Sequence, residues 1–141
     1  MSLISYPVDD RLLADSHELF VWQQCHIRLN KNATIPWFLI IPETNQIEYC
    51  DLPIKQQNEI SLLGKNIGQY LKTTMGAEKI NFAAIGNVVQ QLHVHVIGRN
   101  RQDPQWPGVV WGASLPSKEY TSQQINVLKS DLYKLLAGEQ P

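Results

Sequence analysis

Residues 88–97 are strand-like, and from Gln91 to Val96 polar and hydrophobic residues alternate, which is the pattern of a β-strand with one buried face. The polar row of this predicted strand consists of Gln91, His93 and His95. The residues between them are bulky or β-branched and can pack on a core. The two histidines and the glutamine must therefore face solvent or a ligand pocket.

Helical spacing of apolar residues predicts two long helices. The main helix covers residues 53–74, and a C-terminal helix begins with a capping box at residues 121–124 and ends at Gly138. Gly64 and Gly68 lie one turn apart on the main helix, where each costs about 1 kcal/mol of helix propensity relative to Ala. A close approach between this helix and a neighbouring element would justify both glycines.

Shorter patterns predict the remaining strands, a short helix and a turn. Further strands are predicted at residues 25–29, 37–42 and 78–85, with candidate short extended pieces at 46–49 and 109–112. A short helix is predicted at residues 7–16, and residues 18–22 fit either a strand or a helix end. Gly86 and Asn87 would form a tight hairpin turn into the histidine strand, bringing the face of Asn81 beside the histidines.

Composition narrows the class of protein. The 141 residues fit one α+β domain over residues 1–141, and 43% hydrophobic with 18% charged residues is typical of a globular protein. A net charge of -1 offers no basic surface for a nucleic-acid polymer. No secretory signal or membrane span is predicted, so we expect a cytoplasmic protein without a membrane partner. We expect Cys25 and Cys50 to be buried thiols.

The two histidines suit chemistry at one small anion. Their side chains would lie about 6 to 7 Å apart along a strand that rises roughly 3.3 Å per residue. A neutral imidazole is a nucleophile and a general base, and a protonated one donates to phosphate oxygens. A pair of ordinary surface histidines remains the alternative for an isolated His-x-His.

The stretch Gln-Leu-His-Val-His-Val-Ile at residues 91–97 resembles the signature of the histidine triad (HIT) family, with Gln91 in place of the first histidine. Residues 30–36 resemble the nucleoside-side loop of HIT hydrolases, and residues 80–81 resemble their asparagine-bearing strand. Gly86-Asn87 resembles their phosphate turn. The chain departs from the family at Trp37-Phe38, where a histidine is common, and at Val88, where a serine is common.

The resemblance implies a fold and a set of roles. The fold would be an antiparallel sheet of about five strands with a main helix and a C-terminal helix. His93 would be the nucleophile that becomes nucleotidylated, and His95 would contact phosphate oxygens, with Gln91 beside them. The other implied contacts are phosphate at Asn81, Gly86 and Asn87, nucleoside at Asn30, Ile27 and Leu29, and leaving group at Trp106. The family implies no metal or other cofactor and a homodimer.

We therefore expect a nucleotide phosphohydrolase or nucleotidyl transferase of the dinucleoside polyphosphate or nucleoside phosphoramidate type. A purine mononucleotide derivative is the favoured substrate class. Two alternatives stay open. One is a nucleotide-binding module that lost catalysis with its first histidine. The other is a metal site at His93 and His95, which would need a third ligand such as His26.

Overall fold

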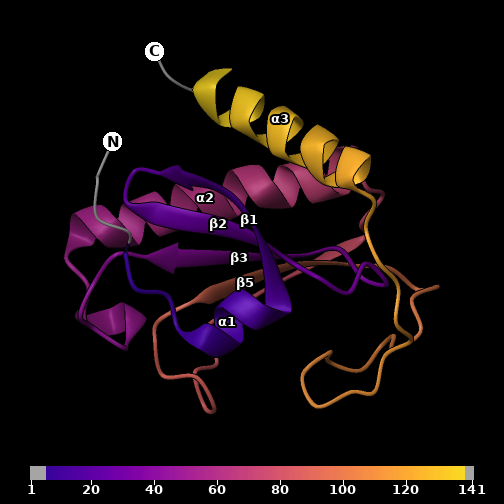
Figure 1. The fold of residues 1–141 in the computed structure, drawn as a ribbon, viewed down its shortest axis with the longest axis horizontal. Helices are drawn as coiled ribbons and strands as arrows, with labels where there is room; N and C mark the ends of the chain where they lie inside the picture. The colour runs from indigo at the N-terminus through magenta and orange to yellow at the C-terminus, as the bar shows by residue number, and fades with distance from the viewer. Residues whose placement is uncertain (1–5, 139–141) are drawn as a thin grey trace.

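Five strands form one antiparallel sheet in the order β1-β2-β3-β5-β4. A computed structural model describes residues 6–138 of the protein. The strands are β1 (Ser16–Trp22), β2 (Cys25–Asn30), β3 (Trp37–Pro42), β4 (Lys79–Ala83) and β5 (Val94–Arg99). Figure 1 shows β1, β2, β3 and β5 running side by side. The predicted α+β fold is confirmed, and residues 18–22 belong to a strand.

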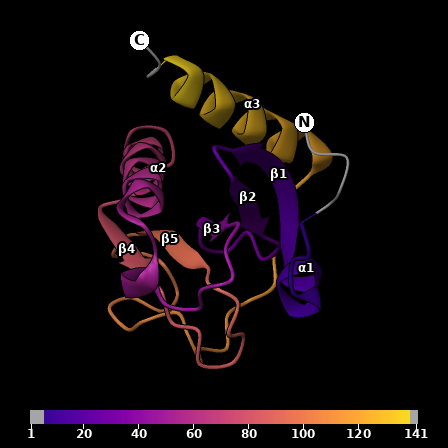
Figure 2. The same cartoon turned by 90° about the vertical axis from the view of Figure 1, so that its left-hand side faces the viewer.

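The helices divide the sheet into two different faces. They are α1 (Asp10–Asp15), α2 (Ile54–Thr73) and α3 (Ser122–Gly138), with a 3-10 turn η1 at Tyr49–Asp51. In Figure 2, α2 and α3 lie on one side of the sheet, while α1 and the orange loop segments lie on the other. We call these two sides the helix face and the open face. Among residues 6–138, no helix is long and apolar enough to cross a membrane.

The main core fills the space between the helix face and α2. Every second residue of β2, β3 and β5 points into it, because side chains alternate along a strand. From the sheet these are Ile27, Leu29, Phe38, Ile40, Val94 and Val96, and from α2 they are Ile60, Leu63, Ile67 and Leu71. Each is at most 2% exposed. The apolar stripe predicted for the main helix is thus confirmed.

Local signals in the sequence place both long helices. A Cβ atom on Gly64 would clash with the ring of Phe82, so glycine lets α2 approach β4 closely with this ring in place. At the start of α3, Thr121 Oγ1 accepts from the Gln124 backbone N–H at 3.1 Å. Gln124 Oε1 in turn accepts from the Thr121 backbone N–H at 2.8 Å, which completes the predicted capping box.

Two predicted strand boundaries are wrong near the histidines. The strand expected at residues 88–97 begins only at Val94, and residues 84–93 form a loop instead of a tight hairpin at Gly86-Asn87. The reason is that Gln91 forms its hydrogen bonds with groups outside the sheet. Its carbonyl oxygen lies 2.7 Å from His93 Nδ1, and its side chain bonds to residues 7 and 9.

Other short predictions also fail. Residues 46–49 are not an edge strand, because both neighbours of β3 are already β2 and β5 and the sheet edges are β1 and β4. Residues 109–112 form a bend and a turn. Cys25 is buried as expected, and burial raises the pKa of its thiol to about 12, but Cys50 is exposed.

Candidate active site

A cavity of about 780 Å³ lies on the open face of the sheet. Trp37 and Leu39 of β3 and His95 of β5 line its floor, in agreement with the pairing of Leu39 with His95 across the two strands. His93 lines it from the end of the loop before β5. The two predicted histidines therefore do face one cavity, away from the main core.

His93 is held in one tautomer by a main-chain carbonyl. Its Nδ1 lies 2.7 Å from the Gln91 carbonyl oxygen, and the side chain is 7% exposed. Because a carbonyl only accepts, Nδ1 must carry the hydrogen. Nε2 of the neutral ring then keeps its lone pair. His93 is consequently set up as a nucleophile or base through Nε2.

His95 is held in the opposite tautomer. The indole Nε1–H of Trp37 donates to His95 Nδ1 at 2.9 Å, and indole nitrogen can only donate. The hydrogen of the neutral His95 ring must therefore sit on Nε2. Burial, and secondly the charge of His93, lower the pKa of His95 to about 3. His95 thus stays neutral near pH 7 and offers one N–H donor.

Aromatic rings pack the histidine pair from two sides. The His93 and His95 ring centroids are 4.9 Å apart, in a T-shaped arrangement. Trp111 lies 5.2 Å from His95 and 6.3 Å from Trp37, again edge to face. A lone pair and an N–H donor therefore stand next to each other in a fixed frame. This arrangement can attack one atom of an anion while donating to another.

The two tryptophans were missing from the predicted site. Trp37 lies two residues before Leu39 on β3 and pairs with Ile97, so its side chain points to the open face, as that of His95 does. That relation follows from the period of two once β3 and β5 are known to be neighbours. Trp111 comes from a turn, and no periodic signal in the sequence points to it.

Three predicted phosphate and nucleoside residues do line the cavity, namely Gly86, Asn87 and Asn30. Gly86 has a φ of 67°, a left-handed conformation that favours glycine, so the turn itself needs this residue. Asn30 ends β2, and its Oδ1 accepts from the Asn32 backbone N–H at 3.0 Å. The side-chain amides of Asn30 and Asn87 therefore share one cavity with the two histidines.

Asn81 is not among the lining residues of the cavity. Its Oδ1 accepts from Arg99 Nη1 at 3.2 Å. Arg99 is 2% exposed and makes two hydrogen bonds to Asp103, at 2.8 and 3.1 Å. Burial alone would raise the pKa of Asp103, but hydrogen bonds from Arg99 and from backbone N–H groups lower it. Asn81 thus belongs to a buried ion-pair cluster beside the site, and its contact with a phosphate remains a prediction.

The structure places three further predicted contact residues outside the cavity. Ile27 and Leu29 are both 0% exposed in the main core, on the opposite face of the sheet from the cavity. Trp106 lies outside the cavity lining, and its ring sits 5.8 Å from the Arg99 guanidinium carbon. Successive side chains of a strand point to opposite faces of the sheet. Because Ile27 and Leu29 of β2 point to the helix face, they cannot line the cavity on the open face.

Gln91 does not complete a row of three side chains. Its Oε1 accepts from the Asp9 backbone N–H at 2.7 Å, and its Nε2 donates to the Pro7 carbonyl oxygen at 2.9 Å. The side chain is therefore directed to the N-terminal segment and does not line the cavity. Only the main-chain carbonyl of Gln91 reaches a histidine.

The metal alternative lacks its third ligand. Within residues 6–138, no group of three or more His, Cys, Asp or Glu side chains could hold a metal ion. His26, the expected third ligand, lies on β2, which β3 separates from β5. Its Nε2 is instead paired with Glu43 Oε2 at 2.7 Å.

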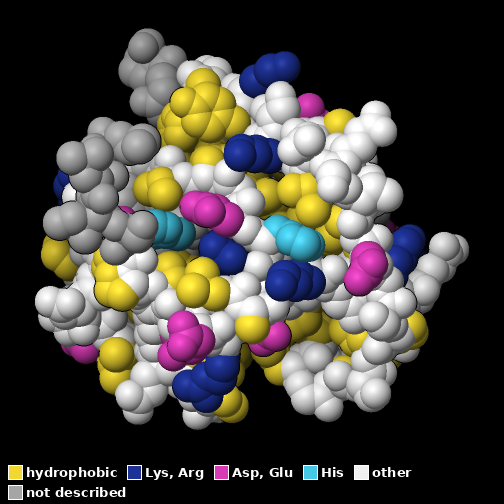
Figure 3. Space-filling model, viewed as in Figure 1, with side chains coloured by type: hydrophobic (Ala, Val, Ile, Leu, Met, Phe, Trp, Pro, Cys, Tyr) yellow, Lys and Arg dark blue, Asp and Glu magenta, His cyan; other side chains and the backbone are white. Residues whose placement is uncertain are grey.

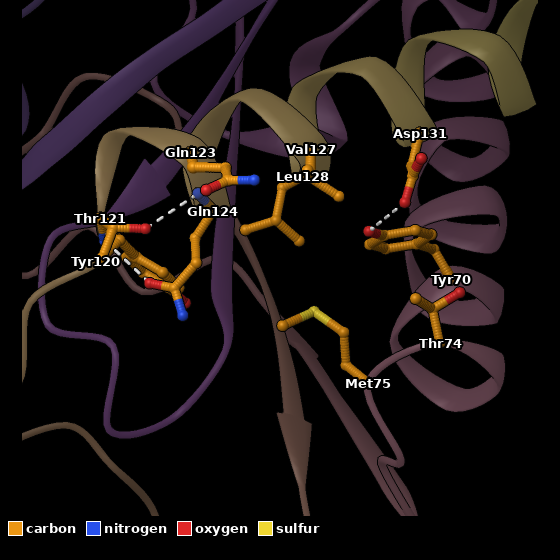
Figure 4. Close-up of a pocket in the computed structure, with 10 residues that line it drawn as sticks. All are labelled: Tyr70, Thr74, Met75, Tyr120, Thr121, Gln123, Gln124, Val127, Leu128 and Asp131. Atoms are coloured by element: carbon orange, nitrogen blue, oxygen red, sulfur yellow. Dashed lines mark hydrogen bonds between the residues drawn. The ribbon is translucent and has the colours of Figure 1, made fainter.

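A second cavity of about 400 Å³ lies between the end of α2 and the start of α3. Figure 4 shows its apolar lining of Met75 and Leu128, with Tyr70 hydrogen-bonded to Asp131. No basic side chain or histidine lines it, so it lacks groups that would attract an anion. On the face of the molecule seen in Figure 3, basic and acidic side chains are interspersed, and neither kind forms a broad patch.

Comparison with known proteins gives consistent results. A family model described as the HIT domain matches residues 13–102. A crystal structure of a histidine triad protein from Marinobacter aquaeolei VT8 is 35% identical, with a TM-score of 0.84 over 94% of this chain and 97% of that chain. A search of curated proteins gave no match.

Two rhizobial proteins are similar to a comparable degree. A histidine triad protein from Sinorhizobium meliloti 1021 is 31% identical, with a TM-score of 0.84 over 92% of this chain and 96% of that chain. A histidine triad protein from Bradyrhizobium japonicum is 29% identical, with a TM-score of 0.83 over 93% and 98% of the two chains. The likeness thus extends over nearly the full length of each relative.

Proposed function

This chain belongs to the HIT domain family, and from that premise we propose that its cavity binds a nucleotide and that His93 forms a covalent bond to the α-phosphorus. The reaction is hydrolysis or transfer of the nucleotidyl group of a nucleoside phosphoramidate or a dinucleoside polyphosphate. The observation that carries the proposal is the pair of opposite tautomers at His93 and His95. A purine mononucleotide unit remains the favoured substrate.

In the first step, the Nε2 lone pair of His93 attacks the α-phosphorus. The bond from phosphorus to the leaving group breaks, its electron pair departs with the leaving group, and that group takes up a proton from solvent. In the second step, water attacks phosphorus, the N–P bond breaks, and His93 recovers its lone pair while the water loses a proton. One difficult displacement is thereby divided into two easier ones.

His95 and the loop before β5 would stabilise the phosphoryl oxygens. The Nε2–H of His95 donates without adding charge, because the pKa of this buried ring is far below 7. Gly86 and Asn87 line the same cavity, and their backbone N–H groups would supply further donors. Fixed donors of this kind stabilise charge that develops in the transition state.

The nucleoside would occupy the remainder of the cavity. Its volume of about 780 Å³ falls within the usual range of small-molecule sites, roughly 300 to 1,000 Å³. Asn30 offers an amide for ribose hydroxyls, and the indole of Trp111 offers an aromatic surface for a base. These residues replace Ile27 and Leu29 in the proposed nucleoside site.

A homodimer remains part of the proposal. The edge strand β4 has one unpaired side in the single chain, and Phe82 on it is 49% exposed. An unpaired edge that carries an exposed aromatic residue can join a second sheet.

The experiment is to trap the covalent intermediate. The wild-type protein is mixed with adenosine phosphoramidate, quenched in neutral denaturant during turnover, and digested for mass spectrometry. We expect one nucleotidyl group on the peptide containing His93. His93→Ala should lose the adduct and on the order of 10³-fold or more of the turnover, whereas His26→Ala, outside the cavity, should keep both. Full turnover by His93→Ala would refute the mechanism.

One observation favours the second candidate, a nucleotide-binding module without turnover. The side chain of Gln91 points away from the cavity, so only two side chains of the signature face the ligand. This candidate predicts that AMP binds while neither phosphoramidates nor dinucleoside polyphosphates are hydrolysed. Measurable turnover with an adduct on His93 would exclude it.

A further inference from the structure

Gln91 uses both ends of its side-chain amide on one distant segment. Oε1 accepts from the Asp9 backbone N–H at 2.7 Å, and Nε2 donates to the Pro7 carbonyl oxygen at 2.9 Å. Both partners are main-chain atoms, 82 and 84 residues away along the chain. We call residues 7–15 the N-terminal arm. The amide pairs with the arm much as one residue of a strand pairs with its neighbour.

The same residue also holds the nucleophile. The Gln91 carbonyl oxygen accepts from His93 Nδ1, so Gln91 touches the arm with its side chain and His93 with its backbone. Asp9 of the arm lies close enough for charge on His93 to affect it. The pKa of Asp9 is lowered mainly by the Arg11 backbone N–H, with a smaller contribution from the charge of His93.

Beyond its contact with Gln91, the arm forms one wall of the cavity. Arg11, Leu12 and Asp15 all line it. Leu12 is 6% exposed and is the buried residue of α1. Arg11 is the one Lys or Arg side chain among the lining residues.

The Arg11 side chain is available to an anion. It is 58% exposed, and its one ion pair within residues 6–138 is a long contact of 3.4 Å from Nε to Asp9 Oδ1. A phosphate in the cavity would offer a stronger partner, because guanidinium binds phosphate through charge-assisted, often paired hydrogen bonds. Arg11 of the arm thus supplies a full countercharge for a nucleotide in this cavity.

We propose that Gln91 is a positioning residue that docks the N-terminal arm over the cavity, and that Arg11 on this arm binds the phosphate of the ligand. The inference rests on the proposed function, since it takes a nucleotide phosphate as the ligand. It gives the exchange at the first triad position a structural purpose. The glutamine satisfies one main-chain donor and one main-chain acceptor at once, through the two ends of one amide.

The test measures binding of AMP and of orthophosphate by calorimetry to the full chain. Gln91→Ala and Arg11→Ala should each weaken both ligands about tenfold, the usual order for one charge-assisted contact. Arg11→Lys should keep most of the affinity. The double variant should bind no more weakly than the weaker single variant, because Gln91 acts through Arg11. Arg101→Ala is the matched control, an exposed arginine paired with Glu78 outside the cavity.

A second measurement follows the arm itself by amide hydrogen exchange. The Asp9 amide is protected by Gln91, so Gln91→Ala should exchange it at least about tenfold faster, while Arg11→Ala should leave it unchanged. Unchanged exchange in Gln91→Ala, or AMP binding by Arg11→Ala equal to that by Arg101→Ala, would overturn the inference. A His93 adduct without these binding effects would support the proposed covalent mechanism and refute the role of the arm. Binding effects without an adduct would support the role of the arm and refute the covalent mechanism.

Discussion

The two faces of the sheet are built on different principles. On the helix face, a single apolar core joins β2, β3 and β5 to α2 and α3, and most of its residues are almost fully buried. On the open face, Ile35, Ile97 and Val110 form a small buried cluster, with Trp37 and Trp111 packed against it. The buried polar residues on or beside the open face include Arg28, His93, His95 and Arg99.

The difference separates stability from function. On the helix face, many apolar contacts stabilise the fold together, and each contributes according to the apolar area that it buries. On the open face, individual hydrogen bonds orient individual groups, as the Gln91 carbonyl does for His93 and the Trp37 indole does for His95. Changes to the helix face should therefore lower stability, whereas changes to the open face should alter the chemistry of the site.

The largest effect on stability is expected at the centre of the main core. Ile67 is 0% exposed on α2, so Ile67→Ala should lower the free energy of unfolding by about 2 to 5 kcal/mol. AMP affinity should stay within about twofold of wild type where the variant is folded. Urea unfolding and calorimetry measure the two quantities. Leu62→Ala, on the same helix but 45% exposed, is the control and should lose far less. An equal loss from both variants would contradict the comparison.

A smaller effect should appear when the open face is acidified. The pKa of His95 is about 3 in the folded protein and 6.5 ordinarily, so between these values the unfolded chain binds one more proton. Stability is therefore unaffected above pH 6.5 and falls as pH decreases, by up to about 1.4 kcal/mol per pH unit.

His95→Gln isolates this contribution. The variant should be less stable than wild type at pH 7 but should lose less further stability between pH 6.5 and pH 5. Urea unfolding at several pH values provides the slopes. Identical slopes for the two proteins would show that His95 does not resist protonation in the folded state.

The helix face could be predicted from the sequence almost entirely. Its residues repeat at periods of 3.6 or 2, so the stripe containing Ile67 and the strand Trp37–Pro42 followed directly from their spacing. The Thr121 capping box was equally local. Even the close approach at Gly64 was expected from the cost of glycine within a helix.

The open face could be predicted only in part. The positions of His93 and His95 followed from their motif, but the partners of Gln91 lie more than 80 residues away and leave no periodic trace. Trp111 reaches the cavity from a turn for the same reason. The alternation along β2 groups Ile27 with Leu29 on one face, but it does not tell which face of the sheet carries the cavity. Both residues lie in the main core instead.

The most direct test of the central claim is the protonation site of each imidazole, read from ¹⁵N NMR of the histidine rings at neutral pH. Our interpretation predicts hydrogen on Nδ1 of His93 and on Nε2 of His95, since one ring donates to a carbonyl and the other accepts from an indole. Trp37→Phe should disturb only the His95 assignment. Hydrogen on the same nitrogen in both rings, or a doubly protonated His95 at pH 6, would contradict the proposed division between nucleophile and donor.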